Sequence, residues 1–289
     1  MKLFTDSGAY SAYHNNSSVV LQDYIDFIRQ NEDAIEVYAN LDDISSPEQS
    51  WKNQEEMERQ GLNPIPVYHL GEPTSFLHRA MKYDYFAVGG IASKLTSYGA
   101  LSTYLDTVFS EVCTKKTDYY PSNKVHGFGI ATPQLLVRYP WWSADTTSWV
   151  QYGRYGIILI PRLLNGSFRY DKPPYTVAVS SRSKAVGEEK HYRNFSDREK
   201  EWINKYCENL GCPMGRTLFK QVTPDYILKE NEKWTDRKEK TRVEKIIDRG
   251  LCCDGEMRDR VNLSYFLALE KYQSEWPWRW TLAKDQMFS

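Results

Sequence analysis

The sequence predicts a mixed α/β fold, a (β/α)8 TIM barrel followed by a helical C-terminal region. Short apolar segments alternate with amphipathic helical segments, and eight of the apolar segments have the length of strands. Such alternation is typical of a parallel sheet with right-handed crossovers, and eight strands favour a closed barrel over an open, doubly wound sheet. After about residue 185 the chain becomes highly charged. We therefore expect a barrel core over residues 1–185 and a helical region over residues 186–289 that completes the barrel.

The expected strands share a short apolar run bounded by polar residues or glycine. They are Lys2–Thr5, Ala34–Leu41, Ile65–Tyr68, Tyr85–Val88, Lys124–Phe128, Trp141–Ala144, Gly156–Ile160 and Tyr175–Val179. The expected helices have apolar residues at helical spacing and polar residues opposite. Those of the core are Val19–Arg29, Ser46–Gln60, Thr74–Met81 and Tyr98–Cys113. Those of the C-terminal region are Glu188–Leu210, Thr217–Asn231, Glu232–Arg249 and Gly255–Gln273.

The composition is that of a folded protein. Hydrophobic residues make up 41% and charged residues 26% of the 289 residues, which excludes global disorder. The longest apolar run, Gly156–Pro161, is far shorter than the roughly 20 residues of a membrane helix. The N-terminal residues lack the apolar region of a secretory signal, so we expect a cytoplasmic location. Five cysteines, an odd number without a framework spacing, argue against a disulfide scaffold.

Charge is distributed unevenly along the chain, although the net charge is only −1. Residues 1–100 carry 7 Lys/Arg against 14 Asp/Glu, whereas residues 101–250 carry 25 against 18. This distribution is compatible with a carboxylate-lined site beside a phosphate-binding surface. The same distribution would result if these charged side chains lay on solvent-exposed faces that bind nothing. The candidate phosphate contacts in the basic middle are Arg138, Arg154, Arg182 and Lys184.

Polar residues and glycines follow six consecutive expected strands, at the point where each strand ends. In chain order they are Asp6, Asp42–Asp43, His69, Gly89–Gly90, Gly127–Gly129 and Asp145. In a TIM barrel the active site lies at the C-terminal ends of the strands. A single Asp after a strand is usually a helix cap or turn residue, but six such positions in register predict a site.

Three separated carboxylates and one imidazole can perform a covalent displacement at a sugar. One carboxylate attacks the anomeric carbon, a second moves the proton of the leaving group, and a third accepts N–H bonds from a base edge. Metal-dependent hydrolysis is disfavoured because no His-x-His follows the first strand. A Ser–His–Asp triad is disfavoured because the chain lacks a Gly-x-Ser-x-Gly nucleophile elbow.

Several short motifs resemble, in the same order, those of the tRNA-guanine transglycosylase (queuine tRNA-ribosyltransferase) family. Thr5–Tyr10 resembles the family's T-D-S-G-G-[FY], and Leu41–Ile44 resembles F-D-E-C. Val67–Gly71 lies where the family has V-Q-G-G, and Phe86–Ala92 resembles the G-G-L-A segment. His126–Pro133 resembles M-G-V-G-T-P, and Ser143–Gly156 aligns with G-x-D-M-F-D-C-x-x-P-T-R-x-x-R-x-G. No single motif is specific, but the ordered combination is.

The resemblance implies a TIM-barrel enzyme that exchanges a guanine in nucleic acid for a 7-deazaguanine such as preQ0, through a covalent glycosyl-enzyme intermediate. It implies that Asp6 is the general acid/base and that Asp42 reads the N1–H and amino edge of guanine. His69 replaces a Gln that contacts the base carbonyl. The backbone that closes the base pocket is implied to comprise Gly89, Gly90 and Ile91 with Ala92. The turn at Gly127–Gly129 lacks the third glycine of a dinucleotide fingerprint, and we interpret it as a turn that a ligand approaches, with Gly129 as a base contact.

The nucleophile is implied to be a carboxylate after the sixth strand. A gapless alignment from Thr132-Pro133 places Asp145 on an earlier Asp of the family and Ser148 on the nucleophile. A shift of three residues restores Asp145 as the nucleophile. We favour Asp145 because a carboxylate is the better leaving nucleophile, and Ser148 is the alternative.

The family's zinc motif, C-x-C-x-x-C with a distant His, is absent. Cys207, Cys212 and the adjacent Cys252-Cys253 do not reproduce it, so neither a metal nor another cofactor is expected. This absence and the short chain resemble the divergent branch that inserts 7-deazaguanines into DNA, often in phages. We expect DNA as the substrate, tRNA as the alternative, and a free 7-deazaguanine base as the second partner. No membrane partner is expected, a homodimer is left open, and a phage-encoded chain would act in the host cytoplasm.

Two further functions remain as alternatives. A TIM-barrel glycoside hydrolase would suit the 9 Trp and 21 Tyr of the chain. A nucleic-acid-binding paralogue without chemistry would suit the alignment of Ser148 with the nucleophile. In the favoured hypothesis the C-terminal region contacts nucleic acid, and the target guanine is flipped out of its stack.

Overall fold

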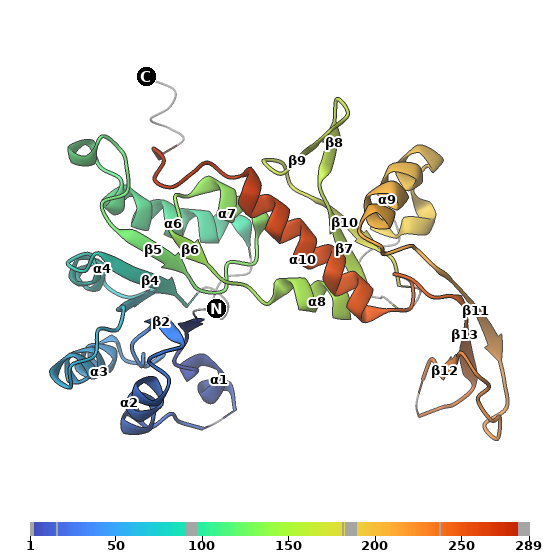
Figure 1. The fold of residues 1–289 in the computed structure, drawn as a ribbon, viewed down its shortest axis with the longest axis horizontal. Helices are drawn as coiled ribbons and strands as arrows, with labels where there is room; N and C mark the ends of the chain where they lie inside the picture. The colour runs from blue at the N-terminus through green and yellow to red at the C-terminus, as the bar shows by residue number, and fades with distance from the viewer. Residues whose placement is uncertain are drawn as a thin grey trace. The chain divides into compact units, whose positions relative to one another are not determined.

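The computed structural model of the chain describes residues 3–15, 17–90, 97–180, 182, 190–236 and 238–282 (Figure 1). The chain divides into two compact units, one formed by Met1–Thr146 with Ser274–Ser289 and the other by Thr147–Gln273. The expected boundary after residue 185 lies within the second unit. The two units are described separately below.

Unit 1 contains the first six expected strands, all parallel. They are β1 (Leu3–Thr5), β2 (Ile35–Tyr38), β3 (Val67–His69), β4 (Tyr85–Gly89), β5 (Lys124–Gly127) and β6 (Ser143–Ala144). β1 pairs with β2, and β3, β4, β5 and β6 form one sheet in that order. A parallel bridge between Ala39 and Ile65 joins the segment after β2 to the segment before β3. The strands are therefore neighbours in sequence order, as expected for strands joined by crossover helices.

Helices connect these strands where amphipathic segments were expected. They are α1 (Ala9–His14), α2 (Leu21–Gln30), α3 (Pro47–Arg59), α4 (Thr74–Ala80), α6 (Tyr98–Val112) and α7 (Pro133–Arg138), with a 3-10 turn η1 (Lys115–Thr117). α3 begins at Pro47 because Ser46 accepts a hydrogen bond from the backbone N–H of Gln49 and proline needs no such partner. The sequence did not predict the short helices α1 and α7.

The parallel sheet packs apolar side chains on both faces, as alternation along a strand requires. On one face, Phe86 and Val88 of β4 belong to the largest core cluster, with Phe109 of α6. On the other face, Ala87 belongs to a smaller cluster with Val67 of β3. Both faces of the sheet are thus covered, and the polar residues at the strand ends lie beyond this core.

The aromatic core of unit 1 provides a stability prediction. The fully buried Phe109 stacks on Tyr139 and contacts Trp141 edge-on, each with ring centroids 4.9 Å apart. Phe109→Ala removes the ring and leaves a cavity, so we expect a loss of about 3–5 kcal/mol in the free energy of unfolding. Phe27→Ala on α2, where 49% of the side chain is exposed, is the control and should cost less than about 1 kcal/mol. Urea unfolding followed by fluorescence measures both, and equal losses would contradict this packing.

Unit 2 (Thr147–Gln273) departs from the expected barrel. β7 (Ile157–Ile160) and β10 (Tyr175–Ala178) were expected as parallel strands, but they pair antiparallel. The chain reverses between them through a hairpin, β8 (Arg162–Leu164) and β9 (Ser167–Arg169). Asn165 and Gly166 form its turn with φ of 51° and 78°, and Asn-Gly is a strong hairpin signal that the sequence interpretation overlooked.

The C-terminal region also differs from the expected set of helices. Two of the expected helices exist, as α9 (Asp197–Asn209) and α10 (Gly255–Tyr272). The expected helices Thr217–Asn231 and Glu232–Arg249 are wrong, because these residues form the antiparallel sheet β11 (Arg216–Gln221), β13 (Arg242–Asp248) and β12 (Glu232–Trp234).

The charged side chains of residues 217–249 gave the pattern of an exposed helix surface. In the structure some of them form ion pairs between different strands. Lys220 bonds Glu232 at 2.6 Å, between β11 and β12. Val243, Ile246 and Ile247 make β13 rich in β-branched residues, which favour strands. The remaining helical elements of unit 2 are α8 (Ser148–Arg154) and the 3-10 turn η3 (Tyr192–Asn194).

The fold is thus of the mixed α/β class, with parallel sheets in unit 1. No closed barrel is formed by the strands of the described residues. None of the helices in those parts of the chain combines the length and the apolar character needed to cross a membrane.

Candidate active site

Unit 1 brings together four of the residues expected at the strand ends. Asp6 follows β1, Asp42 follows β2, His69 ends β3 and Asp145 follows β6. His69 hydrogen-bonds Asp42, and the charges of Asp42 and Asp145 both act on Asp6. The C-terminal edge of the parallel strands therefore carries a cluster of carboxylates with one imidazole.

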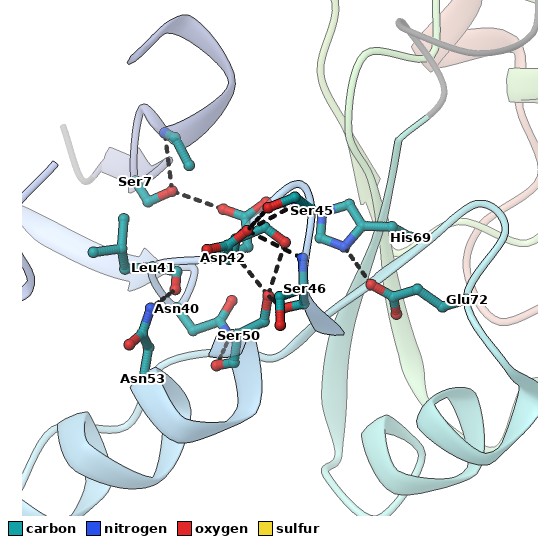
Figure 2. Close-up of polar contacts among 12 residues, drawn as sticks. Ser7, Asn40, Leu41, Asp42, Ser45, Ser46, Ser50, Asn53, His69 and Glu72 are labelled. Carbon is teal, nitrogen blue, oxygen red and sulfur yellow. Dashed lines mark hydrogen bonds and ion pairs between the residues drawn. The ribbon is translucent and has the colours of Figure 1, made fainter. Parts of the chain in front are cut away.

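His69 lies between two carboxylates (Figure 2). Its Nε2 is 2.8 Å from Asp42 Oδ2, and its Nδ1 is 2.9 Å from Glu72 Oε1. The three side chains are only 8–11% exposed. Ser7 Oγ donates to the other oxygen of Asp42 at 2.9 Å. Asp42 is therefore held through both oxygens, and His69 faces a carboxylate through both ring nitrogens.

The turn after β3 brings Glu72 back to His69. The backbone N–H of Glu72 donates to the carbonyl of His69, and Tyr68 Oη donates to the carbonyl of Glu72. Gly71 lies within this turn with φ of 93°, a conformation that glycine adopts at little cost. The turn from Tyr68 to Glu72 thus brings the imidazole of His69 into contact with the carboxylate of Glu72, three residues later.

The loop before α3 positions Asp42. Asp43 accepts hydrogen bonds from Ser45 and Ser46. Asn53 of α3 donates to the carbonyl of Leu41 (Figure 2). The hydrogen bonds from Ser45 hold the pKa of Asp43 below its ordinary value. Asp43 is therefore a loop-closing residue, whereas Asp42 faces His69.

The two carboxylates determine the charge of His69. Burial alone lowers the pKa of an imidazole, but the hydrogen bonds to Asp42 and Glu72 outweigh burial and raise the pKa of His69 to about 9. His69 is then an imidazolium at neutral pH and donates through both ring nitrogens. These two charge-assisted hydrogen bonds fix the orientation of the ring.

A pH dependence of stability follows from this pKa. The pKa of His69 is about 6.5 when unfolded and about 9 when folded, so protonation stabilises the fold. The full contribution, up to about 3 kcal/mol, is present below pH 6.5 and is lost as the pH rises to about 9. Urea unfolding between pH 6 and 9.5 measures this loss.

Glu72→Gln should weaken that pH dependence, because one of the two carboxylates that raise the pKa of His69 is removed. His78→Gln is the matched control, since His78 faces Glu111 in an exposed ion pair. An identical pH dependence in the wild type and Glu72→Gln would contradict this role of Glu72.

The glycine pair at the end of β4 allows the close packing of His69. A Cβ on Gly89 would lie 3.0 Å from the ring carbon Cδ2 of His69 and 3.2 Å from Val67. Gly90 has φ of 74°, and a Cβ there would lie 3.1 Å from the backbone nitrogen of Leu70. Both glycines are therefore needed to position His69, whether or not a base also approaches them.

Asp145 is anchored through one carboxylate oxygen. The backbone N–H of Gly129 donates to Oδ1 at 2.8 Å, and His126 Nε2 faces the same oxygen at 3.7 Å, just beyond hydrogen-bonding distance. Loss of hydration raises the pKa of a carboxyl, but His126 and the N–H of Gly129 outweigh it and hold the pKa of Asp145 below its ordinary value. Asp145 is therefore ionised, and its side chain is 57% exposed.

Asp6 is perturbed in the opposite direction. Loss of hydration, followed by repulsion from Asp42 and a smaller repulsion from Asp145, raises the pKa of Asp6 above its ordinary value. The N–H groups of Ser7 and Gly8 reduce this effect without reversing it. Asp6 remains exposed to solvent, so it is accessible to a ligand.

A cleft of about 220 Å³ adjoins Asp42, between α1 and the loop that follows β2. Ala12 and Tyr13 line it from α1, and Asp42, Asp43 and Ile44 line it from the loop. The cleft therefore gives a small ligand access to the carboxylate that His69 holds.

The remaining expected site residues lie elsewhere or outside the described residues. Ile91, Ala92 and Lys184 are among the latter. Arg138 of unit 1 is bonded to Asp106 at 2.8 and 3.0 Å. In unit 2, Arg182 pairs with Glu244, and Arg154 is exposed near the end of α8. Pairing leaves Arg138 and Arg182 less available to phosphates than Arg154.

The alternative nucleophile is placed differently from Asp145. Ser148 is the first residue of α8 in unit 2, and it is 92% buried. Asp145 belongs to unit 1 and interacts electrostatically with Asp6. Asp145 is thus the candidate for which an interaction with Asp6 is shown.

The cysteines do not fit a zinc site. Cys207 and Cys212 are buried in the apolar core of unit 2, and burial raises the pKa of Cys207 to about 12. A structural zinc site needs about four ligand side chains around one point. Within the described ranges, no three or more His, Cys, Asp or Glu side chains are arranged to hold a metal ion.

Sequence interpretation missed four residues around the site: Glu72, Tyr85, His126 and Ser143. Glu72 could have been suggested by its spacing from His69 across a turn that contains glycine. His126 could have been suggested by its position inside an apolar strand, since a buried imidazole needs a partner. Tyr85 and Ser143 carry no comparable signal, because their contacts depend on which strands are neighbours.

Comparison of the chain with protein-family models and with curated proteins gives no match.

Proposed function

We propose that this chain is a transglycosylase that exchanges a guanine in nucleic acid for a 7-deazaguanine. The observation that carries the proposal is the cluster of Asp6, Asp42, His69 and Asp145 at one edge of the parallel strands. The shifts of two of its carboxyl groups support it. The pKa of Asp145 is lowered and that of Asp6 is raised. Two carboxyl groups shifted in opposite directions suit one nucleophile and one general acid.

The reaction assigned to these groups has two halves. Asp145 attacks the anomeric carbon C1′, the bond from C1′ to the guanine nitrogen breaks, and Asp6 donates its proton to the departing base. A covalent sugar ester on Asp145 results. The incoming 7-deazaguanine then gives a proton to Asp6, its nitrogen bonds to C1′, and the ester bond breaks to restore the Asp145 carboxylate. Each group ends in its starting state, so no other co-reactant is needed.

Asp42 is assigned to base recognition. An ionised carboxylate accepts hydrogen bonds only, and it therefore suits the N1–H and amino donors on the edge of guanine. His69 and Ser7 fix the orientation of Asp42 while each oxygen keeps a further lone pair. Because both ring nitrogens of His69 face carboxylates, we assign to His69 the orientation of Asp42, rather than direct contact with the base carbonyl.

The size of the cleft supports a base as the ligand. At about 220 Å³ it is smaller than the roughly 300–1,000 Å³ typical of sites for drug-sized ligands. Its volume suits a ligand of the size of a base better than several sugar rings. The resemblance of the motifs suggests guanine as the leaving base and a preQ0-type base as the entering one. The absence of the zinc motif suggests DNA rather than tRNA.

We further propose that unit 1 represents the first six strands of a TIM-type barrel. The sequential order of its parallel strands supports this, since a doubly wound sheet reverses its strand order. The location of the carboxylates at the C-terminal strand ends agrees with the position of active sites in such barrels.

Calorimetric titration of the wild-type chain tests the class of ligand. We expect free preQ0 to bind, and an oligosaccharide such as chitotetraose not to bind. Adenine, which lacks the N1–H and 2-amino donors, should bind much more weakly. Binding of the oligosaccharide without binding of preQ0 would replace this proposal with a glycoside hydrolase.

A further inference from the structure

His126 lies on β5 with its ring locked by aromatic neighbours. The ring stacks on Phe4 of β1 with centroids 4.2 Å apart and an interplanar angle of 18°, and Phe128 contacts it edge-on at 4.5 Å. The side chain is 3% exposed. Its orientation is therefore fixed before any substrate binds.

Two hydroxyl groups extend from His126 across the neighbouring strands. Ser143 Oγ of β6 lies 2.7 Å from His126 Nδ1, and Tyr85 Oη of β4 lies 2.6 Å from the same Ser143 oxygen. Burial raises the pKa of Tyr85, so its hydroxyl keeps its proton. The three side chains form a continuous hydrogen-bonded chain inside unit 1.

At the other end of this chain, His126 Nε2 faces Asp145. This nitrogen is buried, makes no hydrogen bond to the described residues and lies 3.7 Å from Asp145 Oδ1. Gly129 N–H donates to the same oxygen. Both groups therefore contact Oδ1 of Asp145, and neither contacts Oδ2.

The direction of the hydroxyl protons selects one tautomer of His126. If Tyr85 donates to Ser143 and Ser143 donates to Nδ1, then Nε2 carries the ring proton and points it at the Asp145 carboxylate. In the reverse arrangement the Nε2 lone pair would face the negative oxygen, which is repulsive. Of the two neutral tautomers, only the first is favourable along the whole chain.

We propose that His126 is a positioning residue for Asp145, held in its Nε2–H tautomer by the hydroxyl relay of Ser143 and Tyr85. This inference rests on the proposed function, because it assigns Asp145 as the nucleophile. The relay directs Oδ1 toward His126 and Gly129 and presents Oδ2 to the sugar. It also favours the ionised form of Asp145, near which Asp6 and Asp42 are the other acidic groups of this edge.

The tautomer can be measured without any enzymatic activity. Nitrogen-15 NMR of the histidine-labelled chain should show His126 with a protonated Nε2 and an unprotonated Nδ1. Ser143→Ala should remove this preference, whereas Ser143→Thr, which keeps the hydroxyl, should restore it. A wild-type ring protonated at Nδ1 would overturn the relay, whether or not the chain exchanges bases.

The kinetic test uses the pH profile of base exchange. Asp145 must be ionised to attack, so the rate falls at acid pH as this carboxyl is protonated. His126→Gln should lower kcat about 10²-fold with little change in KM, and should move the acid limb to higher pH. Tyr85→Phe should act in the same direction more weakly. Tyr83→Phe, whose hydroxyl bonds Glu58, is the control and should match the wild type.

The outcomes separate the two proposals. An unchanged acid limb in His126→Gln, in a wild type that does exchange bases, overturns the positioning role and leaves the proposed function intact. A wild type without exchange, but with the Nε2–H tautomer that depends on Ser143, overturns the proposed function and leaves the relay in place.

Discussion

Asp145→Asn should abolish base exchange, with a loss on the order of 10⁴-fold in kcat. The amide has nearly the shape of the carboxylate but cannot form the sugar ester, so the covalent intermediate is lost as well. Denaturing electrophoresis of the chain with a guanine-containing oligonucleotide should show an adduct for the wild type and none for the variant. Asp145 is anchored by Gly129 and ionised, which is the state a nucleophile requires.

Asp84→Asn is the matched control, because Asp84 precedes β4 at the opposite end of the strand from Gly89. It should retain both exchange and adduct. Full activity in Asp145→Asn combined with loss in Ser148→Ala would contradict the assignment and make Ser148 the nucleophile.

Replacement of the other two carboxylates should separate recognition from chemistry. Asp42→Asn removes a charged acceptor that would bond two N–H groups of the base. Each such bond contributes about 1.5–3 kcal/mol, so binding of free preQ0 should weaken by about 10²- to 10⁴-fold. Asp6→Asn should leave this binding nearly unchanged and reduce the exchange rate, because only the proton transfer is lost. Calorimetry and rate measurements on both variants make the comparison.

Ser7→Ala is the control for Asp42→Asn. It removes the hydroxyl that bonds Asp42 Oδ1 but keeps the carboxylate and its partner His69. Binding should weaken by about tenfold or less. If Asp6→Asn weakened base binding as much as Asp42→Asn does, the two roles would not be separate.

The strands of unit 1 could be predicted because each is a short apolar run with a clear polar end. Tyr85–Val88, for example, was expected and Tyr85–Gly89 is found. The antiparallel sheet of unit 2 could not be predicted in the same way. Its strands carry charged side chains such as Lys220 of β11 and Glu232 of β12, which form an ion pair. Along the sequence, this pattern of charge resembles that of a solvent-exposed helix.

The candidate site was predictable to the extent that it depends on strand ends. Parallel strands in sequence order bring Asp6, Asp42 and Asp145 to one edge, so their positions along the chain were sufficient. The groups that tune them lie inside the sheet or in a turn. The contact of His126 with Ser143 depends on the register of β5 against β6, which the sequence pattern does not define.

Incorporation of labelled guanine is the most direct test of the central claim. The wild-type chain is incubated with radiolabelled guanine and either guanine-containing DNA or tRNA, and the label that enters each polymer is measured. We predict incorporation into DNA, competition by unlabelled preQ0, and no incorporation by Asp145→Asn. Binding of the nucleic acid with no label entering either polymer would contradict base exchange and identify a chain that binds nucleic acid without this chemistry.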